Sequence, residues 1–245
     1  MSAFSAISVP HSRHFIATAK DYVTIDRMIP LRDVIPSRTF PFFVVIFIAL
    51  NTAAFLFEVS LSDRALQSLL FTYGVVPAQL QLLTVFTSMF LHGGWLHFLG
   101  NMLYLWIFGD NVEDRLGHGR FVLFYFACGA AAALAHAWVN PASRVPTIGA
   151  SGAIAGVMGA YFVLYPNSRV LALVPLVIIM EVIEVPAIVF LGIWFLMQFF
   201  SGVGSLTETG VRTGGVAFWA HVAGFLSGIA GVMVLKKPSR TRWAT

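Results

Sequence analysis

Charged residues are scarce in this sequence. Aspartate, glutamate, lysine and arginine together make up 11% of its 245 residues, whereas hydrophobic residues make up 58%. A soluble domain carries about 25% charged residues, which cover its surface in water. Because this chain lacks the charge for such a surface, its composition excludes an ordinary soluble domain and indicates that lipid is its main solvent.

Several motifs and residue types are also missing. The single cysteine, Cys128, excludes an intrachain disulfide and is expected to be a small core residue. No His-Glu-x-x-His motif occurs, which argues against a zinc-dependent intramembrane protease. Only Asp110 lies near the interior of an apolar run, whereas an intramembrane aspartyl protease needs two aspartates. A transporter is disfavoured because neither internal repeats nor a polar mid-membrane site is visible, although Pro175 and Pro186 leave that alternative open.

Long apolar runs predict the membrane-spanning helices. A helix needs about 20 mainly apolar residues to cross roughly 30 Å of hydrocarbon. Residues 170–180 form too short a run and are followed by Glu181 and Glu184, so we expect an interfacial or partly inserted segment there. The sequence predicts six spans, at residues 39–57, 91–109, 121–139, 149–166, 185–204 and 219–235.

The basic residues predict the orientation of these spans. Lysine and arginine cluster before residue 40 and after residue 235, which fits anchoring at a membrane surface rather than binding to nucleic acid. A seventh span at 170–180 would place the basic tail outside. We therefore expect a cytoplasmic N-terminal segment (1–38), a membrane domain (39–235) and a basic cytoplasmic tail (236–245). With the N-terminus inside, the outer loops hold three of the 15 basic residues: Arg64, Arg144 and Arg212.

Polar residues gather at the predicted outer ends of the even-numbered spans. His92, His97 and Asn101 lie near the start of the second span, Ser151 near the start of the fourth, and His221 near the start of the sixth. Polar side chains in a bilayer are costly, and they are usually functional or paired. Small residues, which let membrane helices approach closely, recur behind Ser151 and His221: Ala155 and Gly159 in the fourth span, and Gly224, Gly228 and Gly231 in the sixth.

Ser151 and His221 are a candidate catalytic pair. A serine hydroxyl becomes a good nucleophile when a neighbouring base takes its proton, and His221 is the candidate base. We expect no acidic residue near the outer starts of these helices, which favours a dyad without a carboxylate. The Asn101 amide, the His97 imidazole and the Ser151 backbone N–H are candidate donors to an oxyanion. His97 and Asn101 are four residues apart and share a helix face, whereas His136 lacks a motif and is expected to be structural.

Three motifs resemble those of the rhomboid family of intramembrane serine proteases. Residues 149–152, Gly-Ala-Ser-Gly, resemble its Gly-x-Ser-Gly nucleophile motif, and residues 220–224, Ala-His-Val-Ala-Gly, resemble its Ala-His-x-x-Gly base motif. Residues 97–101, His-Phe-Leu-Gly-Asn, are similar to its His-x-x-x-Asn oxyanion element, with His92 at the usual upstream position. The resemblance covers about 42–235, and the motifs occur in the family's order.

The resemblance implies a fold and an activity. The fold is an all-α polytopic membrane protein, a bundle of six transmembrane helices with a partly membrane-inserted first loop at residues 60–83. The activity is cleavage of peptide bonds in or near the transmembrane helices of other membrane proteins, with no metal and no nucleotide. Ser151 is implied as the nucleophile and His221 as the base. The other implied site residues stabilise the oxyanion or substrate (Asn101, His97 and Gly152) or support the site (His92, Gly149 and Gly224).

The sequence departs from the family's pattern at two places. Some members carry an aromatic residue one turn after the serine, where it packs on the histidine. Here Ala155 takes that place, so another side chain must hold the imidazole. The Trp-Arg pair found in the first loop of some relatives is absent. Neither departure removes a catalytic group. The family resemblance also implies that the fifth span, with its following loop, is a candidate substrate gate.

One alternative to a protease remains. A non-catalytic rhomboid-like protein would bind transmembrane helices for quality control, but such relatives typically lose the serine or the histidine. Both are present here. We expect a multi-pass protein of the bacterial inner membrane, with its site opening to the outer face. Its expected partners are the lipid bilayer and the transmembrane helices of single-pass substrates, and not nucleic acid.

Overall fold

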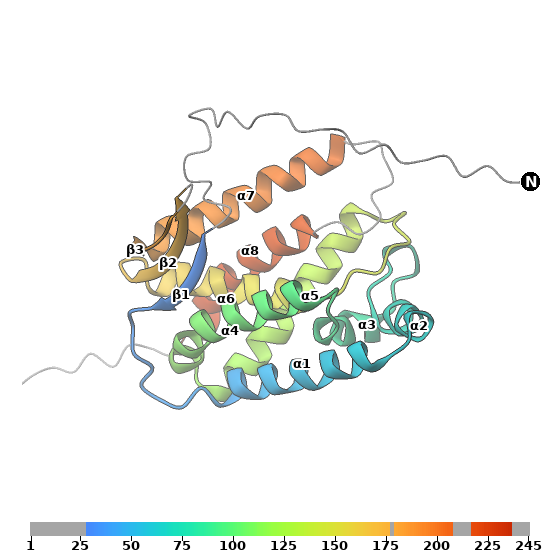
Figure 1. Cartoon of the computed structure of the whole chain (residues 1–245), viewed down its shortest axis with the longest axis horizontal. Helices are drawn as coiled ribbons and strands as arrows, with labels where there is room; N and C mark the ends of the chain where they lie inside the picture. The colour runs from blue at the N-terminus through green and yellow to red at the C-terminus, as the bar shows by residue number, and fades with distance from the viewer. Residues whose placement is uncertain (1–27, 177–178, 208–216, 237–245) are drawn as a thin grey trace, which may run out of the picture.

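Helices form most of the described chain (Figure 1). The computed structural model describes residues 28–176, 179–207 and 217–236. The long helices are α1 (Phe42–Ser60), α4 (Trp95–Leu116), α5 (His118–Val139), α6 (Ser151–Leu164), α7 (Ala187–Thr207) and α8 (Phe218–Leu235). Between α1 and α4 lie α2 (Asp63–Tyr73), α3 (Leu82–Thr87) and two short 3₁₀ turns at Pro77–Gln79 and Ser88–Phe90. Three strands complete the fold: β1 (Ile29–Asp33), β2 (Arg169–Leu176) and β3 (Ile179–Pro186).

Four of the described helices are long and apolar enough to cross a membrane, namely α1, α5, α7 and α8. The segment Leu82–Phe90 and α4 together are also long and apolar enough, although they are bent by 91°. Helix α6 has 14 residues, which is about 21 Å of helix against roughly 30 Å of hydrocarbon. The protein is a mostly helical, multi-pass integral membrane protein, whereas the count of six spans stays a prediction.

Helix α4 extends beyond the span that we predicted at 91–109. It begins at Trp95 because Gly94, with a φ of 138°, turns the chain just before it. It ends at Leu116, after three acidic residues that a search for charge-free runs treats as a boundary. The helix therefore begins and ends later than the predicted span, because local geometry sets its start and paired charges allow it to continue.

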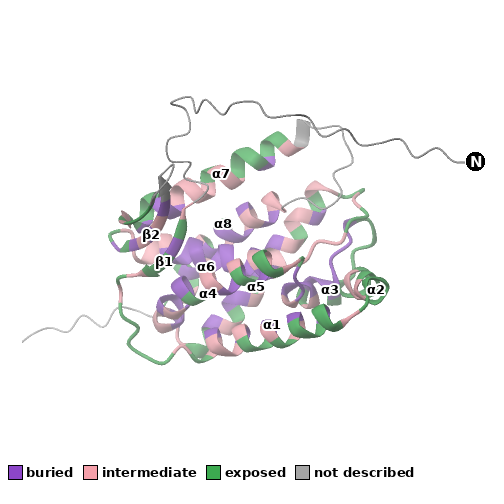
Figure 2. Ribbon diagram, in the orientation of Figure 1, coloured by how far each residue is buried: buried purple, intermediate pink, exposed green. Residues whose placement is uncertain are grey.

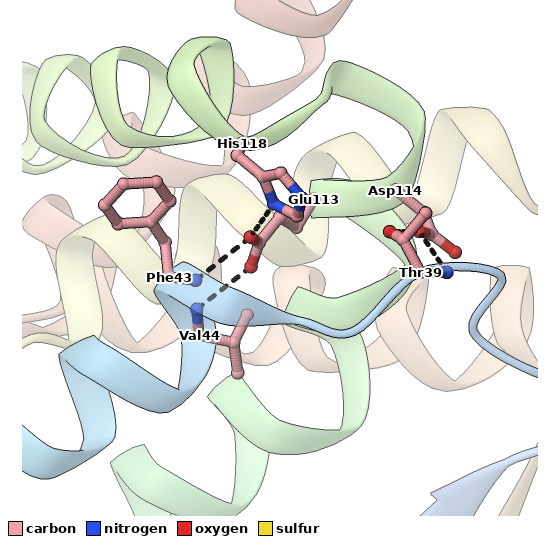
Figure 3. Close-up of polar contacts among 6 residues, drawn as sticks. All are labelled: Thr39, Phe43, Val44, Glu113, Asp114 and His118. Atoms are coloured by element: carbon pink, nitrogen blue, oxygen red, sulfur yellow. Dashed lines mark hydrogen bonds and ion pairs between the residues drawn. The ribbon is translucent and has the colours of Figure 1, made fainter.

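The acidic residues of α4 bind the segment that leads into α1 (Figure 3). The Glu113 carboxylate accepts hydrogen bonds from the backbone N–H groups of Phe43 (3.0 Å) and Val44 (2.9 Å). The Asp114 carboxylate accepts from the hydroxyl and the backbone N–H of Thr39. Because the first N–H groups of a helix have no partner within the helix, these carboxylates satisfy the start of α1 and favour its dipole.

Helix α6 lies in the centre of the bundle (Figure 1), and every residue from Gly152 to Tyr161 is buried (Figure 2). Helix α8 packs against it without intervening side chains. A Cβ added to Gly228 would lie 1.9 Å from the carbonyl oxygen of Gly156, and one added to Gly224 would lie 2.1 Å from that of Gly152. The predicted contact of small faces is thus confirmed at Gly159, Gly224 and Gly228, with backbone against backbone. Gly231 instead faces Phe124 of α5.

A three-stranded antiparallel sheet, in the order β1-β2-β3, joins the bundle beside the start of α7 (Figure 1). Val170 of β2 pairs with Asp33 of β1 and with Val185 of β3. These strands were not predicted, because residues 170–180 were considered only for their length as a membrane span. The signal was an alternation of period two, because Val170, Ala172 and Val174 are all buried on one face. An interfacial position for this segment stays a prediction.

Candidate active site

Ser151 and His221 are hydrogen bonded to each other. The Ser151 Oγ lies 2.8 Å from the His221 Nε2. Ser151 is the first residue of α6, and His221 lies in the first turn of α8. The backbone contact between these helices brings the two side chains together, since Gly224 lies one turn after His221 and faces Gly152. We call this end of the bundle, where α4, α6 and α8 begin, the Ser151 end.

Gly149 is required by both its conformation and its surroundings. Its φ is 123°, in the region that favours glycine, and it turns the chain into α6. A Cβ at this position would lie 2.7 Å from the Cε1 and Nε2 atoms of His97. The missing side chain therefore leaves room for the His97 imidazole two residues before Ser151.

His97 presents its Nε2 to the start of α6. The backbone N–H of Gly93 donates to the His97 Nδ1 over 3.2 Å, so this nitrogen is the acceptor. A neutral imidazole carries one proton, which then resides on Nε2, on the side of the ring that faces Gly149. His97 consequently offers an N–H donor beside Ser151.

Asn101 lies one turn after His97 on α4 and is buried, with 7% of its surface exposed. Its Nδ2 has no hydrogen-bond partner among the residues that the structure describes. Leaving a buried donor unpaired costs about 1–3 kcal/mol. Asn101 lines the same cleft as Ser151 and His221, so this donor is available to a group that enters the cleft.

The cleft has a volume of about 970 Å³ and is lined by α4, α5, α6, α7, α8 and the 143–148 segment. Its walls are mixed, with apolar side chains beside the candidate polar residues. His136, which we expected to be structural, also lines it. In the described part of the chain, no three metal-binding side chains lie together.

His92 lies behind His97 rather than beside Ser151. The two rings are 5.3 Å apart at 63°. Its backbone N–H donates to the Glu58 carboxylate over 3.1 Å, and Glu58 is buried at the end of α1. We expected no acidic residue near these helix starts. This was wrong for α4, because Glu58 comes from a different span.

Gly152 packs against α5, because an added Cβ would lie 2.6 Å from the Cβ of Ala132. This contact accounts for the glycine through packing, and its role in stabilising an oxyanion stays a prediction.

Two residues of α7 contact His221 and were not predicted. The Gln198 Oε1 lies 2.8 Å from the His221 Nδ1, and the Trp194 ring lies 5.8 Å from the imidazole. The sequence did contain a signal, since Gln198 is the one side-chain amide in a 21-residue apolar helix. A polar group at such a position is usually functional or paired.

The fold and this site together define a class of protein: helical membrane proteins in which a serine and a histidine are hydrogen bonded inside the bundle. Residues 79–238 match the rhomboid domain, and the chain belongs to the rhomboid family.

Curated relatives come from three kinds of organism. The chain is 29% identical to the mitochondrial rhomboid protein 1 of Saccharomyces cerevisiae over 60% of this chain and 40% of the relative. It is 34% identical to the rhomboid protease GluP of Bacillus subtilis over 53% of this chain and 26% of the relative. It is 30% identical to the chloroplastic rhomboid-like protein 11 of Arabidopsis thaliana over 78% of this chain and 64% of the relative. The chain thus spans less than two thirds of the length of each.

Proposed function

We propose that this protein is an intramembrane serine endopeptidase that cleaves peptide bonds in or near the transmembrane helices of other membrane proteins. The observation that carries the proposal is the 2.8 Å hydrogen bond between the Ser151 Oγ and the His221 Nε2, at a cleft within a lipid-facing bundle. Membership of the rhomboid family, and a relative named as a protease, support the same activity.

The geometry supports nucleophilic catalysis by a dyad. The Ser151 Oγ attacks the carbonyl carbon of the substrate while its proton passes to the His221 Nε2. His221 then gives this proton to the leaving amine as the peptide C–N bond breaks, which leaves an acyl group on Ser151. Water, deprotonated by His221, attacks the acyl carbonyl, and the serine leaves with the proton.

The carbonyl oxygen becomes negatively charged in each attack and needs donors. Three candidate donors line the cleft with Ser151: the Asn101 Nδ2, the His97 Nε2–H and the backbone N–H of Ser151 itself. Donors that are already oriented stabilise the transition state more than water does, because they need no rearrangement. We therefore assign His97 and Asn101 to the oxyanion.

The proposed substrates are transmembrane helices of single-pass membrane proteins. A carbonyl within an intact helix is already hydrogen bonded along the helix, so the substrate must unwind locally before Ser151 can reach it. Helices that begin with small, helix-weakening residues should therefore be cleaved best.

The proposed arrangement in the membrane has six spans, including the short α6, with both termini cytoplasmic and the Ser151 end facing outward. A bacterial inner membrane is the proposed location. Exposed apolar side chains between α1 and α4, such as Leu82 (77%) and Leu83 (66%), favour a first loop that is partly inserted in lipid. Three parts of this arrangement lie outside the described residues: 1–27 of the cytoplasmic segment 1–38, 208–216 of the candidate gate loop, and 237–245 of the basic tail. The division into 1–38, 39–235 and 236–245 is likewise proposed.

The test uses the purified protein in liposomes with a single-span reporter whose helix begins with small residues. Cleavage and labelling by a fluorophosphonate probe are followed for wild type, Ser151→Ala and His221→Ala, with Ser68→Ala on the exposed face of α2 as the matched control. We expect both signals in wild type and in the control, and loss of both in the two active-site variants.

Two other outcomes overturn parts of the proposal. Cleavage that survives Ser151→Ala would exclude the serine mechanism. A folded wild type that neither cleaves several reporters nor reacts with the probe would exclude the protease and favour the non-catalytic, helix-binding alternative.

A further inference from the structure

Helix α7 contacts the candidate base through two side chains one turn apart. Gln198 lies at the His221 Nδ1, and Trp194 lies against the imidazole ring. On α6, the position one turn after Ser151 is Ala155, which has no ring to offer. The groups that hold His221 therefore come from α7 and not from the helix that carries the serine.

We propose that Gln198 and Trp194 are positioning residues for His221. Gln198 fixes the tautomer of the imidazole through Nδ1, and Trp194 limits the rotation of the ring. The inference rests on the proposed function, because it concerns how the base of that reaction is held.

The tautomer follows from the two hydrogen bonds of His221. The Ser151 hydroxyl must donate to Nε2 before attack, so this nitrogen must carry no proton. The single proton of the neutral ring then resides on Nδ1, where it needs an acceptor. The Gln198 Oε1 lies 2.8 Å away and accepts it. With the opposite tautomer His221 would have no lone pair at Nε2, and Ser151 would have no base.

Trp194 is itself held in place. Its ring centroid lies 5.8 Å from that of His221, with 37° between the planes, and 6.2 Å from that of Phe225 on α8. A ring within about 6 Å of a cation stabilises it, and the imidazolium forms when His221 takes the serine proton. Trp194 therefore restrains the neutral ring and favours its charged form during attack.

The groups facing His221 come from every neighbouring helix. Ser151 approaches from α6, and Gln198 and Trp194 from α7, all of them uncharged. His97 of α4 and His136 of α5 interact with it electrostatically. Replacing Gln198 with a glutamate would place a negative charge beside the His221 Nδ1. The effect of that charge on His221 can therefore be tested by this substitution.

The experiment measures reporter cleavage in liposomes by the full chain across pH 4.5 to 9. Gln198→Met keeps the length of the side chain and removes the acceptor. We expect kcat to fall about 10- to 100-fold with KM unchanged, a part of the ~10²–10⁴ that general acid–base catalysis provides. Gln67→Met on the exposed face of α2 is the matched control, with no expected change.

Gln198→Glu separates positioning from folding. A carboxylate still accepts from Nδ1–H, so we expect it to retain cleavage at neutral pH. It also stabilises the imidazolium, so the acidic limb of the pH–kcat profile should move to higher pH by about one unit. A purely structural glutamine would change thermal stability and leave this limb in place.

Trp194→Phe and Trp194→Leu test the ring. Trp194→Phe should keep most of the kcat, whereas Trp194→Leu should lower it several-fold. Trp138→Leu on α5, at an 83% exposed tryptophan, is the control.

The results distinguish this inference from the proposed function. If wild type cleaves, Ser151→Ala does not, and Gln198→Met keeps the wild-type kcat and pH profile, the positioning role is wrong while the protease stands. If folded wild type neither cleaves nor reacts with a fluorophosphonate, the proposed function fails, and this inference fails with it.

Discussion

Buried polar side chains have different surroundings at the two ends of the bundle. At the end where α4 and α6 finish, which we call the Glu113 end, Glu113 is 1% exposed and binds two backbone N–H groups and His118 (Figure 3). At the Ser151 end, the Asn101 Nδ2 and the His136 Nδ1 have no partner among the described residues. The carboxylate at the Glu113 end is therefore fully hydrogen bonded, whereas two buried nitrogen atoms at the Ser151 end are not bonded to any described residue.

This difference separates polar groups that stabilise the fold from polar groups that we propose to act in catalysis. Satisfied networks rigidify a fold, whereas an unpaired buried group costs free energy and calls for an explanation. At the Glu113 end the groups join elements together, since the Asn111 Nδ2 of α4 donates to Asp33 of β1 over 2.9 Å. At the Ser151 end the unpaired groups line a cleft. Substitutions at the two ends should therefore change different properties.

The largest effect is expected for Asn101→Ala at the Ser151 end. In serine proteases, loss of one oxyanion donor lowers kcat by about 10²- to 10³-fold. Thermal stability should not fall, because the removed Nδ2 has no partner in the described structure. Reporter cleavage and thermal unfolding measured on the same sample check both statements.

The matched control for Asn101→Ala lies ten residues further along the same helix. Asn111 donates to the Asp33 carboxylate and to the Ile35 carbonyl oxygen. Asn111→Ala should lower stability and leave the kcat of the folded protein unchanged. The comparison between the two ends fails if Asn101→Ala destabilises the protein without affecting kcat.

A smaller effect is expected for Glu113→Gln at the Glu113 end. Glutamine keeps the shape but has one acceptor oxygen, and its amide N–H groups face a backbone N–H of Phe43 or Val44. Hydrogen bonds to charged groups contribute about 1.5–3 kcal/mol each, so the free energy of unfolding should fall by about that amount. Cleavage per folded molecule should stay at the wild-type value.

Glu184→Gln provides the reference for Glu113→Gln. Glu184 pairs with Arg169 over 3.1 Å, but both side chains are at least half exposed. Such pairs contribute less than about 1 kcal/mol. Equal losses of stability in the two variants would show that burial of Glu113 has no special consequence.

The sequence predicted the Ser151 end better than the Glu113 end, for a physical reason. Its residues are polar side chains inside apolar runs, namely Ser151, His97, Asn101 and His221. The alternating direction of the membrane helices is enough to place them at the same end of the bundle. The structure puts these residues around one cleft. Their catalytic roles stay predictions.

The parts that sequence reasoning missed depend on contacts between distant segments. The predicted span ended at Gly109, and the role of Glu113 beyond it was missed because its partners in α1 lie 69 and 70 residues away. Gln198 stood in a span that was judged by its average hydropathy, and its contact with His221 depends on the packing of α7. The strands were missed because residues 170–180 were tested for length and not for alternation.

The smallest expected effect concerns the pH dependence contributed by Asp33. Burial raises the pKa of this carboxyl to about 6, and the Tyr161 hydroxyl, which donates to it over 2.6 Å, partly offsets the rise. Because the folded-state pKa lies above the unfolded value of about 3.9, Asp33 contributes full stability below pH 4 and loses this contribution as the pH rises through 6. Asp33→Asn should flatten the stability profile between pH 4 and pH 7 by about 1 kcal/mol, less than the ~3 kcal/mol of the full pKa shift because water screens this partly exposed carboxyl, measured by thermal unfolding in detergent. The asparagine side chain keeps an oxygen that accepts a hydrogen bond from Tyr161. If the stability of Asp33→Asn still falls over this pH range, the slope belongs to another carboxyl, and Asp110, whose charge acts on Asp33, is the first candidate.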